Sequence, residues 1–199
     1  MTYPGRNRRA DARRSRAAIL DAAVRLLNVE PDISVEAIAA GAGVTRQTVY
    51  AHFPSRERLL VAALARLTEE AVAAMDAAGL DEGPAIEALL RLIDAGGRTA
   101  GRYPVLLQKI GTLNLSAQDD HELHTPVVER LTRVIGRGQR SGEFDGGLPA
   151  GWLASVVVKL GHAASEEREA GRMSGAEAAN ALRTSLLRVL GADRPGSAV

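Results

Sequence analysis

The chain has 199 residues, 46% hydrophobic and 25% charged, so it can bury a core and is not a disordered polymer. It has no cysteine, which excludes disulfides and thiolate metal sites and suits a cytoplasmic location, and no apolar run approaches the about 20 residues that span a bilayer. The net charge of +1 hides ten Arg against six acidic residues in residues 1–58, so we expect only this part to meet a polyanion.

Residues 1–11 are predicted to be a flexible basic arm, because they contain Pro4 and Gly5 and lack a hydrophobic period. Six Arg lie between residues 6 and 16, with one acidic residue among them. Such an arm contacts DNA phosphates or the minor groove, and Arg14 is a candidate for this role. A solvated tail that keeps the protein soluble is the alternative.

A first helix is predicted from Ala12 to Asn28, because apolar residues between 19 and 27 recur at helical spacing. Pro31 prevents its continuation. The stretch 34–60 then shows two short helices, a turn between them and the start of a third helix. Ser34 is predicted to cap the first of these, Gly43 to supply a turn with positive φ, and Thr45 to cap the second.

The second short helix carries Arg46, Gln47 and Thr48 on its exposed N-terminal face. Arg can donate two hydrogen bonds to guanine, Gln pairs with adenine, and Thr contacts a thymine methyl group or a phosphate. Val49 and Phe53 are four residues apart and are expected to pack inward. The layout is that of a helix-turn-helix, which places a helix in the DNA major groove.

Tyr50 and His52 are expected on the flanks of this helix, within reach of the DNA backbone. The alternatives are a partly buried core aromatic for Tyr50 and a plain surface imidazole for His52. Pro54 ends the helix, and the next is predicted from Arg56 to Ala78, with Arg56 in its first turn near free N–H groups that suit a phosphate.

The segments AAILDAAVRLL, SVEAIAAGAGV, TRQTVYAHF and PSRERLL resemble the DNA-binding domain of the TetR family of transcriptional regulators (TetR/AcrR-like). The resemblance implies base or groove contacts from Thr45, Arg46 and Gln47. It implies mainly phosphate contacts from Thr48, Tyr50, His52 and Arg56, and Ser34 and Arg14 complete the predicted DNA-binding set. Gly41 and the loop VEPDI depart from the family pattern without touching the reading face.

The rest of the chain is predicted to be a helical body. Helices are expected from about Pro84, from Tyr103-Pro104, from Thr125-Pro126, from Ala150 to Ala170, and from the capping box Ser174–Glu177. Residues 119–124, before Thr125, are expected to be a polar connector or a helical turn. The glycines at 96–97 and after 135 are expected to weaken or loosen the segments that contain them.

This body resembles, more loosely, the C-terminal half of TetR regulators, which implies a ligand cavity and dimerisation through the last two helices. The ligand-binding candidates are polar or amphipathic groups on apolar helices: Tyr103, Leu107, Gln108, Thr112, Trp152, Lys159 and His162. Surface positions or satisfied core hydrogen bonds are the alternative for each. The dimer candidates are Leu153, Val156, Val157, Leu160, Ala164, Leu182, Leu186 and Val189.

An enzyme is not favoured, because Ser, His and Asp occur in no catalytic pattern and there is no phosphate-binding glycine loop. His121 and His124 could share a helical face and ligate a metal, but a solvated connector explains them better. We therefore predict no metal, no cofactor and no catalytic residue.

The resulting prediction is an all-α protein of about nine helices. It comprises a three-helix DNA-binding domain (1–58, with a basic arm at 1–11) and an effector-binding and dimerisation domain (59–199). The predicted function is a homodimeric repressor released from a near-palindromic double-stranded DNA operator by an unknown small-molecule effector. An activator or an effector-independent regulator of the same fold is one alternative. A helical small-molecule sensor or carrier acting through a protein partner is the other.

Overall fold

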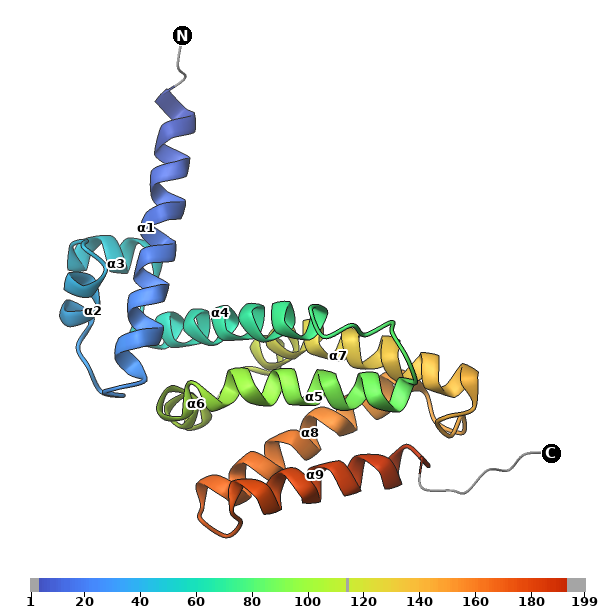
Figure 1. The fold of residues 1–199 in the computed structure, drawn as a ribbon. Helices are drawn as coiled ribbons and strands as arrows, with labels where there is room; N and C mark the ends of the chain where they lie inside the picture. The colour runs from blue at the N-terminus through green and yellow to red at the C-terminus, as the bar shows by residue number, and fades with distance from the viewer. Residues whose placement is uncertain (1–3, 114, 193–199) are drawn as a thin grey trace. The chain divides into compact units, whose positions relative to one another are not determined.

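The computed structural model describes residues 4–113 and 115–192, and these form nine α-helices and no strand (Figure 1). The predicted all-α class is therefore confirmed. The helices are α1 (Pro4–Leu27), α2 (Val35–Gly41), α3 (Arg46–His52), α4 (Arg56–Asp76), α5 (Ala85–Gly101), α6 (Pro104–Gly111), α7 (Ala117–Ser141), α8 (Ala150–Glu169) and α9 (Gly175–Val189). None of these described helices has both the length and the apolar character needed to cross a membrane.

The described residues fall into two compact units. Unit 1 comprises the residues up to 71 together with 97–123, and unit 2 comprises 72–96 together with the residues from 124 onward. Helices α1, α2, α3 and α6 belong to unit 1, and α8 and α9 belong to unit 2. By packing, α6 thus joins the helix-turn-helix, whereas the functional boundary expected after residue 58 stays a prediction.

The core of unit 1 gathers the apolar faces of α1, α2, α3, α4 and α6. Its most buried members include Ile19, Leu27, Ile38, Val49, Phe53, Leu59, Leu106 and Ile110. Val49 is 1% and Phe53 is 4% exposed, which confirms that both point inward. Burial of such side chains contributes about 1.5–3 kcal/mol each, so the core fixes how α3 is presented.

The turn between α2 and α3 forms as its residues predict. Ser34 Oγ accepts the backbone N–H of Ala37, and Thr45 Oγ1 accepts that of Thr48, so each short helix has a side-chain N-cap. Gly43 has φ = 67°, in the left-handed region that favours glycine. A Cβ at Gly41 would lie 2.9 Å from Leu26 Cδ1, so this glycine permits the close approach of α1.

Unit 2 is a second helical core, in which α8 and α9 lie side by side (Figure 1). Its most buried side chains include Leu89, Leu92, Leu131, Ile135, Phe144, Leu153, Val157, Leu186 and Leu190. The predicted capping box is present at the start of α9. Ser174 Oγ accepts the backbone N–H of Glu177, and Glu177 Oε2 accepts that of Ser174.

The N-terminal prediction of a non-helical arm is wrong over the described residues, because α1 begins at Pro4 rather than Ala12. Residues 1–3 lie outside the described part. Proline is tolerated in the first turn of a helix, where its missing N–H has no intrahelical partner, and the arginines that follow are good helix formers. The basic residues of 9–16 are therefore displayed on a helix that continues into the core.

Two further boundaries differ from the sequence prediction. Helix α5 continues through the glycines at 96–97 to Gly101. Residues 119–124 are helical, the second of the two predicted alternatives, and α7 runs on through Pro126 instead of starting at Thr125-Pro126. The true start of α7 is capped by Ser116, whose Oγ accepts the backbone N–H of Asp119. Gly138 also lies inside α7, and its missing side chain leaves room for the Phe144 ring.

Candidate nucleic-acid interface

The N-terminal half of α3 exposes polar side chains, while its opposite face is buried in the unit 1 core. Arg46 and Gln47 are exposed, Tyr50 is 37% exposed, and Val49 between them is buried in the unit 1 core. Thr45 is also exposed and Thr48 half-buried, with their hydroxyl oxygens 2.9 Å apart. These side chains project from the N-terminal half of a helix that is anchored in the core. Such an arrangement allows them to contact base edges.

Arg46 is held by two neighbours. Its Nη1 lies 2.6 Å from Glu36 Oε1 on α2, and its guanidinium lies over the Tyr50 ring, 5.3 Å from the centroid. A hydrogen bond with Tyr50 and then the Glu36 carboxylate raise the pKa of Arg46, so the side chain stays cationic. The predicted base contact therefore requires that Arg46 leave Glu36 or share its N–H groups with it.

The guanidinium of Arg56 already makes hydrogen bonds within the protein. Its half-buried guanidinium donates to the backbone oxygens of Pro31 and Ile33, in the loop between α1 and α2. These bonds hold that loop against the start of α4. The phosphate contact predicted for Arg56 stays a prediction, and would have to use the N–H groups that these carbonyls leave available.

Three more predicted DNA contacts lie around this surface. His52 is half-buried, with its ring centroid 6.2 Å from that of Phe53. Ser34 is exposed at the N-terminus of α2, where its hydroxyl serves as the cap. Arg14 is exposed on α1 and pairs with Asp11. Their roles in DNA binding remain predictions.

Sequence reasoning missed the polar contacts that tie α6 to the helix-turn-helix. Asn28 Nδ2 donates to the Arg102 carbonyl over 2.9 Å, and Asn28 Oδ1 accepts the N–H of Leu106 over 3.3 Å. Asn28 thus caps α6, which has no side-chain cap of its own. These partners are more than 70 residues apart, so no local sequence signal could have revealed them.

A second contact of the same kind joins Lys109 on α6 to Asp32 in the α1–α2 loop. Lys109 Nζ lies 2.6 Å from Asp32 Oδ1. The hydrogen bond from Lys109 and then its charge lower the pKa of Asp32. Both contacts therefore tie α6 to the segment that leads from α1 into α2.

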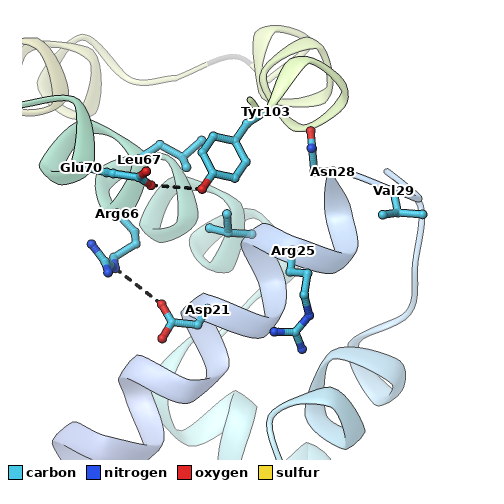
Figure 2. Close-up of a pocket in the computed structure, with 9 residues that line it drawn as sticks. Asp21, Arg25, Asn28, Val29, Arg66, Leu67, Glu70 and Tyr103 are labelled. Atoms are coloured by element: carbon cyan, nitrogen blue, oxygen red, sulfur yellow. Dashed lines mark hydrogen bonds and ion pairs between the residues drawn. The ribbon is translucent and has the colours of Figure 1, made fainter. Parts of the chain in front are cut away.

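Unit 1 also contains an open cavity of about 490 Å³ between α1 and α4 (Figure 2). It is lined by Asp21, Val24, Arg25, Asn28, Val29, Arg66, Leu67, Glu70 and Tyr103. The Tyr103 hydroxyl donates to Glu70 Oε2 over 3.1 Å. Burial, and then the hydrogen bond with Glu70, raise the pKa of Tyr103. Tyr103 is the one predicted ligand-binding residue that lines this cavity.

The other predicted ligand-binding residues are divided between the units. In unit 1, Leu107 packs against the core, and Gln108 and Thr112 are exposed. In unit 2, Trp152 is 61% exposed. Lys159 and His162 are also exposed, at helical spacing along α8. A shared cavity for these residues stays a prediction.

The predicted dimer residues separate into two groups. Leu153, Val157 and Leu186 are at most 2% exposed and belong to the core of unit 2, so they position α8 and α9 from inside one chain. The side chains with exposed surface are Val156, Leu160, Ala164, Leu182 and Val189. Trp152, predicted as a ligand contact, adds the largest exposed apolar side chain of α8.

Within residues 4–113 and 115–192, no group of three or more His, Cys, Asp or Glu side chains is arranged to hold a metal ion.

Comparison with known proteins places these observations in a family context. Residues 19–63 match the profile described as bacterial regulatory proteins, tetR family. The HTH-type transcriptional repressor LfrR of Mycolicibacterium smegmatis is 39% identical over 82 residues, which are 41% of this chain and 43% of that protein. The HTH-type transcriptional regulator EthR of the same species is 30% identical over 174 residues, covering 85% of this chain and 68% of that protein.

The EthR regulator of Mycobacterium tuberculosis is 44% identical over 70 residues, 34% of this chain and 32% of that protein. The matches to it and to LfrR thus span less than half of those relatives' lengths. All these relatives are regulators of transcription, which agrees with the prediction of a regulator rather than an enzyme.

Two solved structures share the fold. The TetR-like regulator LfrR from Mycobacterium smegmatis, in complex with proflavine, is 28% identical with a TM-score of 0.54, covering 87% of this chain and 95% of that chain. FadR from Bacillus subtilis, in complex with stearoyl-CoA, is 18% identical with a TM-score of 0.72, covering 89% and 99%.

Proposed function

Because the chain belongs to the TetR family of bacterial regulatory proteins, we propose that it is a cytoplasmic, sequence-specific DNA-binding regulator that represses transcription as a homodimer. In this proposal a small-molecule effector releases the protein from a near-palindromic operator. The observation that carries the proposal is the outward face of α3, where Arg46, Gln47 and Tyr50 project from a helix anchored by buried Val49.

In this proposal, the chemistry of each side chain decides whether it contacts a base or a phosphate. Thr45, Arg46 and Gln47 meet base edges in the major groove, and Thr48, Tyr50 and His52 meet phosphates. Basic residues of α1, including Arg14, add phosphate contacts. A single α3 spans too few base pairs for specificity in a genome, so two copies related by a two-fold axis read the two half-sites.

The proposed dimer uses the outer faces of α8 and α9. Trp152, Val156 and Leu160 on α8, with Val189 on α9, provide the exposed or half-exposed apolar surface that supports this choice. A second copy would cover this surface. Trp152 is the single tryptophan of the chain, so its fluorescence reports directly on dimer formation.

The effector part of the proposal is supported by a relative. LfrR was crystallised with proflavine, and its structure matches 87% of this chain with a TM-score of 0.54. An effector that binds better to the form with low DNA affinity shifts the population toward that form. By linkage, operator DNA must then weaken effector binding by the same factor, and a titration with and without operator measures both.

The direct test is selection of bound DNA from a random pool by the full chain. We expect a two-fold symmetric consensus, with half-site centres about one helical turn apart if the two α3 helices enter successive major grooves. Failure to enrich any sequence would overturn the DNA-reading proposal. Enrichment of an asymmetric single half-site would overturn its dimeric part.

Variants then test the assigned roles on the selected operator. Gln47→Ala should relax the preference at one base position in each half-site, whereas Tyr50→Ala should weaken binding to all sequences similarly. Gln118→Ala, an exposed glutamine on α7, serves as the matched control. Affinity should also fall steeply as salt rises, because several phosphate contacts release counterions.

A further inference from the structure

Two histidines of unit 2, His124 on α7 and His162 on α8, approach each other closely. Their Nε2 atoms are 3.3 Å apart, and their ring centroids are 5.0 Å apart with the planes inclined at 64°. His124 is half-buried and His162 is exposed, so the pair is open to solvent on one side. The proposed DNA contacts make no use of this pair.

The separation of the two nitrogens suits a shared metal ion. Two Zn–N bonds of about 2.0–2.1 Å at a tetrahedral angle of about 109° place their nitrogens about 3.3–3.4 Å apart. The observed 3.3 Å agrees with this value. It is longer than the about 2.9–3.0 Å that is usual for a hydrogen bond donated by nitrogen.

We propose that His124 and His162 form a transition-metal site that takes Zn²⁺, Ni²⁺ or Cu²⁺ through their Nε2 atoms. Neutral imidazole is a preferred ligand for these ions, whereas Mg²⁺ and Ca²⁺ select oxygen ligands. No third His, Cys, Asp or Glu of the described residues joins the pair in a metal-binding group. The pair thus supplies two of the four ligands that Zn²⁺ usually takes.

The sequence analysis considered a metal pair of His121 and His124 and preferred a solvated connector without a metal. The structure instead brings His124 against His162 on α8. Lys159 lies one helical turn before His162, and Glu166 lies one turn after it. The lysine charge opposes a cation, and the glutamate can accept a hydrogen bond from metal-bound water. A bound ion would link α7 to α8, two helices that sequence separates by a loop.

The test is a titration of the tag-free full chain by isothermal calorimetry with Zn²⁺, Ni²⁺ and Cu²⁺ separately, with Mg²⁺ as the control ion. We expect one transition-metal ion per chain and no binding of Mg²⁺. His124→Ala and His162→Ala should each weaken binding by about tenfold or more, since loss of a supporting group alone costs about that much. His52→Ala, a histidine of unit 1, is the matched control and should leave the affinity unchanged.

A further readout separates metal binding from mere folding effects. The metal should raise the Tm of the wild-type chain but not that of either variant, whose helicity is checked by circular dichroism.

The proposal is overturned if none of the three ions binds at millimolar concentration. It is equally overturned if both variants bind as the wild type does, in which case the two rings share only a proton. Loss of binding in His121→Ala with full binding in His162→Ala would move the site to α7 alone and refute the pairing across helices.

Discussion

Neutralising Glu36 should tighten operator binding. Glu36 holds Arg46 through a 2.6 Å ion pair, and the proposed base contact of Arg46 competes with that pair. The change Glu36→Gln removes the carboxylate charge while keeping the size of the side chain. Arg46 is then free to turn toward guanine, and one negative charge is lost from the surface that we propose binds DNA.

The size of the expected gain in operator affinity follows from how exposed the Arg46 and Glu36 side chains are. The side chains of Arg46 and Glu36 are 59% and 54% exposed, so solvent screens their attraction and the pair is weak. Releasing Arg46 should therefore lower the Kd for the operator by about 1.5- to 5-fold. Glu36 also lies in the first turn of α2, so its neutralisation should destabilise the fold by about 0.3–1 kcal/mol at most.

The assay is fluorescence anisotropy on the selected operator, arranged as a double-mutant cycle with Arg46→Ala. In the Arg46→Ala background, Glu36→Gln should have little remaining effect, because there is no guanidinium to release. Glu129→Gln, which removes an equal charge from an exposed residue of unit 2, is the matched control.

Two results would refute this reasoning. Weaker binding by Glu36→Gln would mean that the ion pair holds Arg46 in its DNA-binding position. An equal gain in the Arg46→Ala background would mean that the effect is general charge and not release of Arg46.

Three further predictions concern stability in urea. Asn28→Ala should lower the free energy of unfolding by about 1–2 kcal/mol, because it removes the side-chain cap of α6 and leaves a backbone N–H unpaired. The hydrogen bond from Arg130 lowers the pKa of Asp76 below its usual 3.8, so this pair stabilises the fold above that pH and its contribution is lost as pH falls through the lower folded pKa. Asp76→Asn should therefore cost stability at pH 7 and progressively less as the pH is lowered through that range, whereas a constant cost would contradict the linkage. Gly138→Ala should destabilise by about 1–3 kcal/mol, because the added Cβ would overlap the Phe144 ring, and wild-type stability in this variant would contradict that packing.

The helix-turn-helix could be predicted from the sequence because its determinants are local. Ser34, Gly43 and Thr45 each act on a backbone within a few residues, and the apolar spacing of Val49 and Phe53 sets which face of α3 is buried. The same reasoning failed at Pro126, because a proline signals a boundary only when packing on either side does not hold the helix together. It also failed at the N-terminus, where a proline begins α1.

Residue types alone do not show which groups each side chain contacts in the folded protein. Whether Leu153 faces the chain's own core or a second copy depends on how α8 packs, and periodicity gives the same stripe in both cases. Likewise, residue type alone does not show that Arg56 donates to the carbonyls of Pro31 and Ile33.

The all-α class, the helix-turn-helix and the outward face of α3 follow from the sequence, because helix periodicity, capping and turn chemistry act over a few residues. The packing of α6 with the helix-turn-helix, the ion pair of Glu36 with Arg46 and the contact of His124 with His162 come from the tertiary structure. Those contacts join residues that are distant in the chain, and their geometry follows from the packing of whole helices rather than from any local pattern.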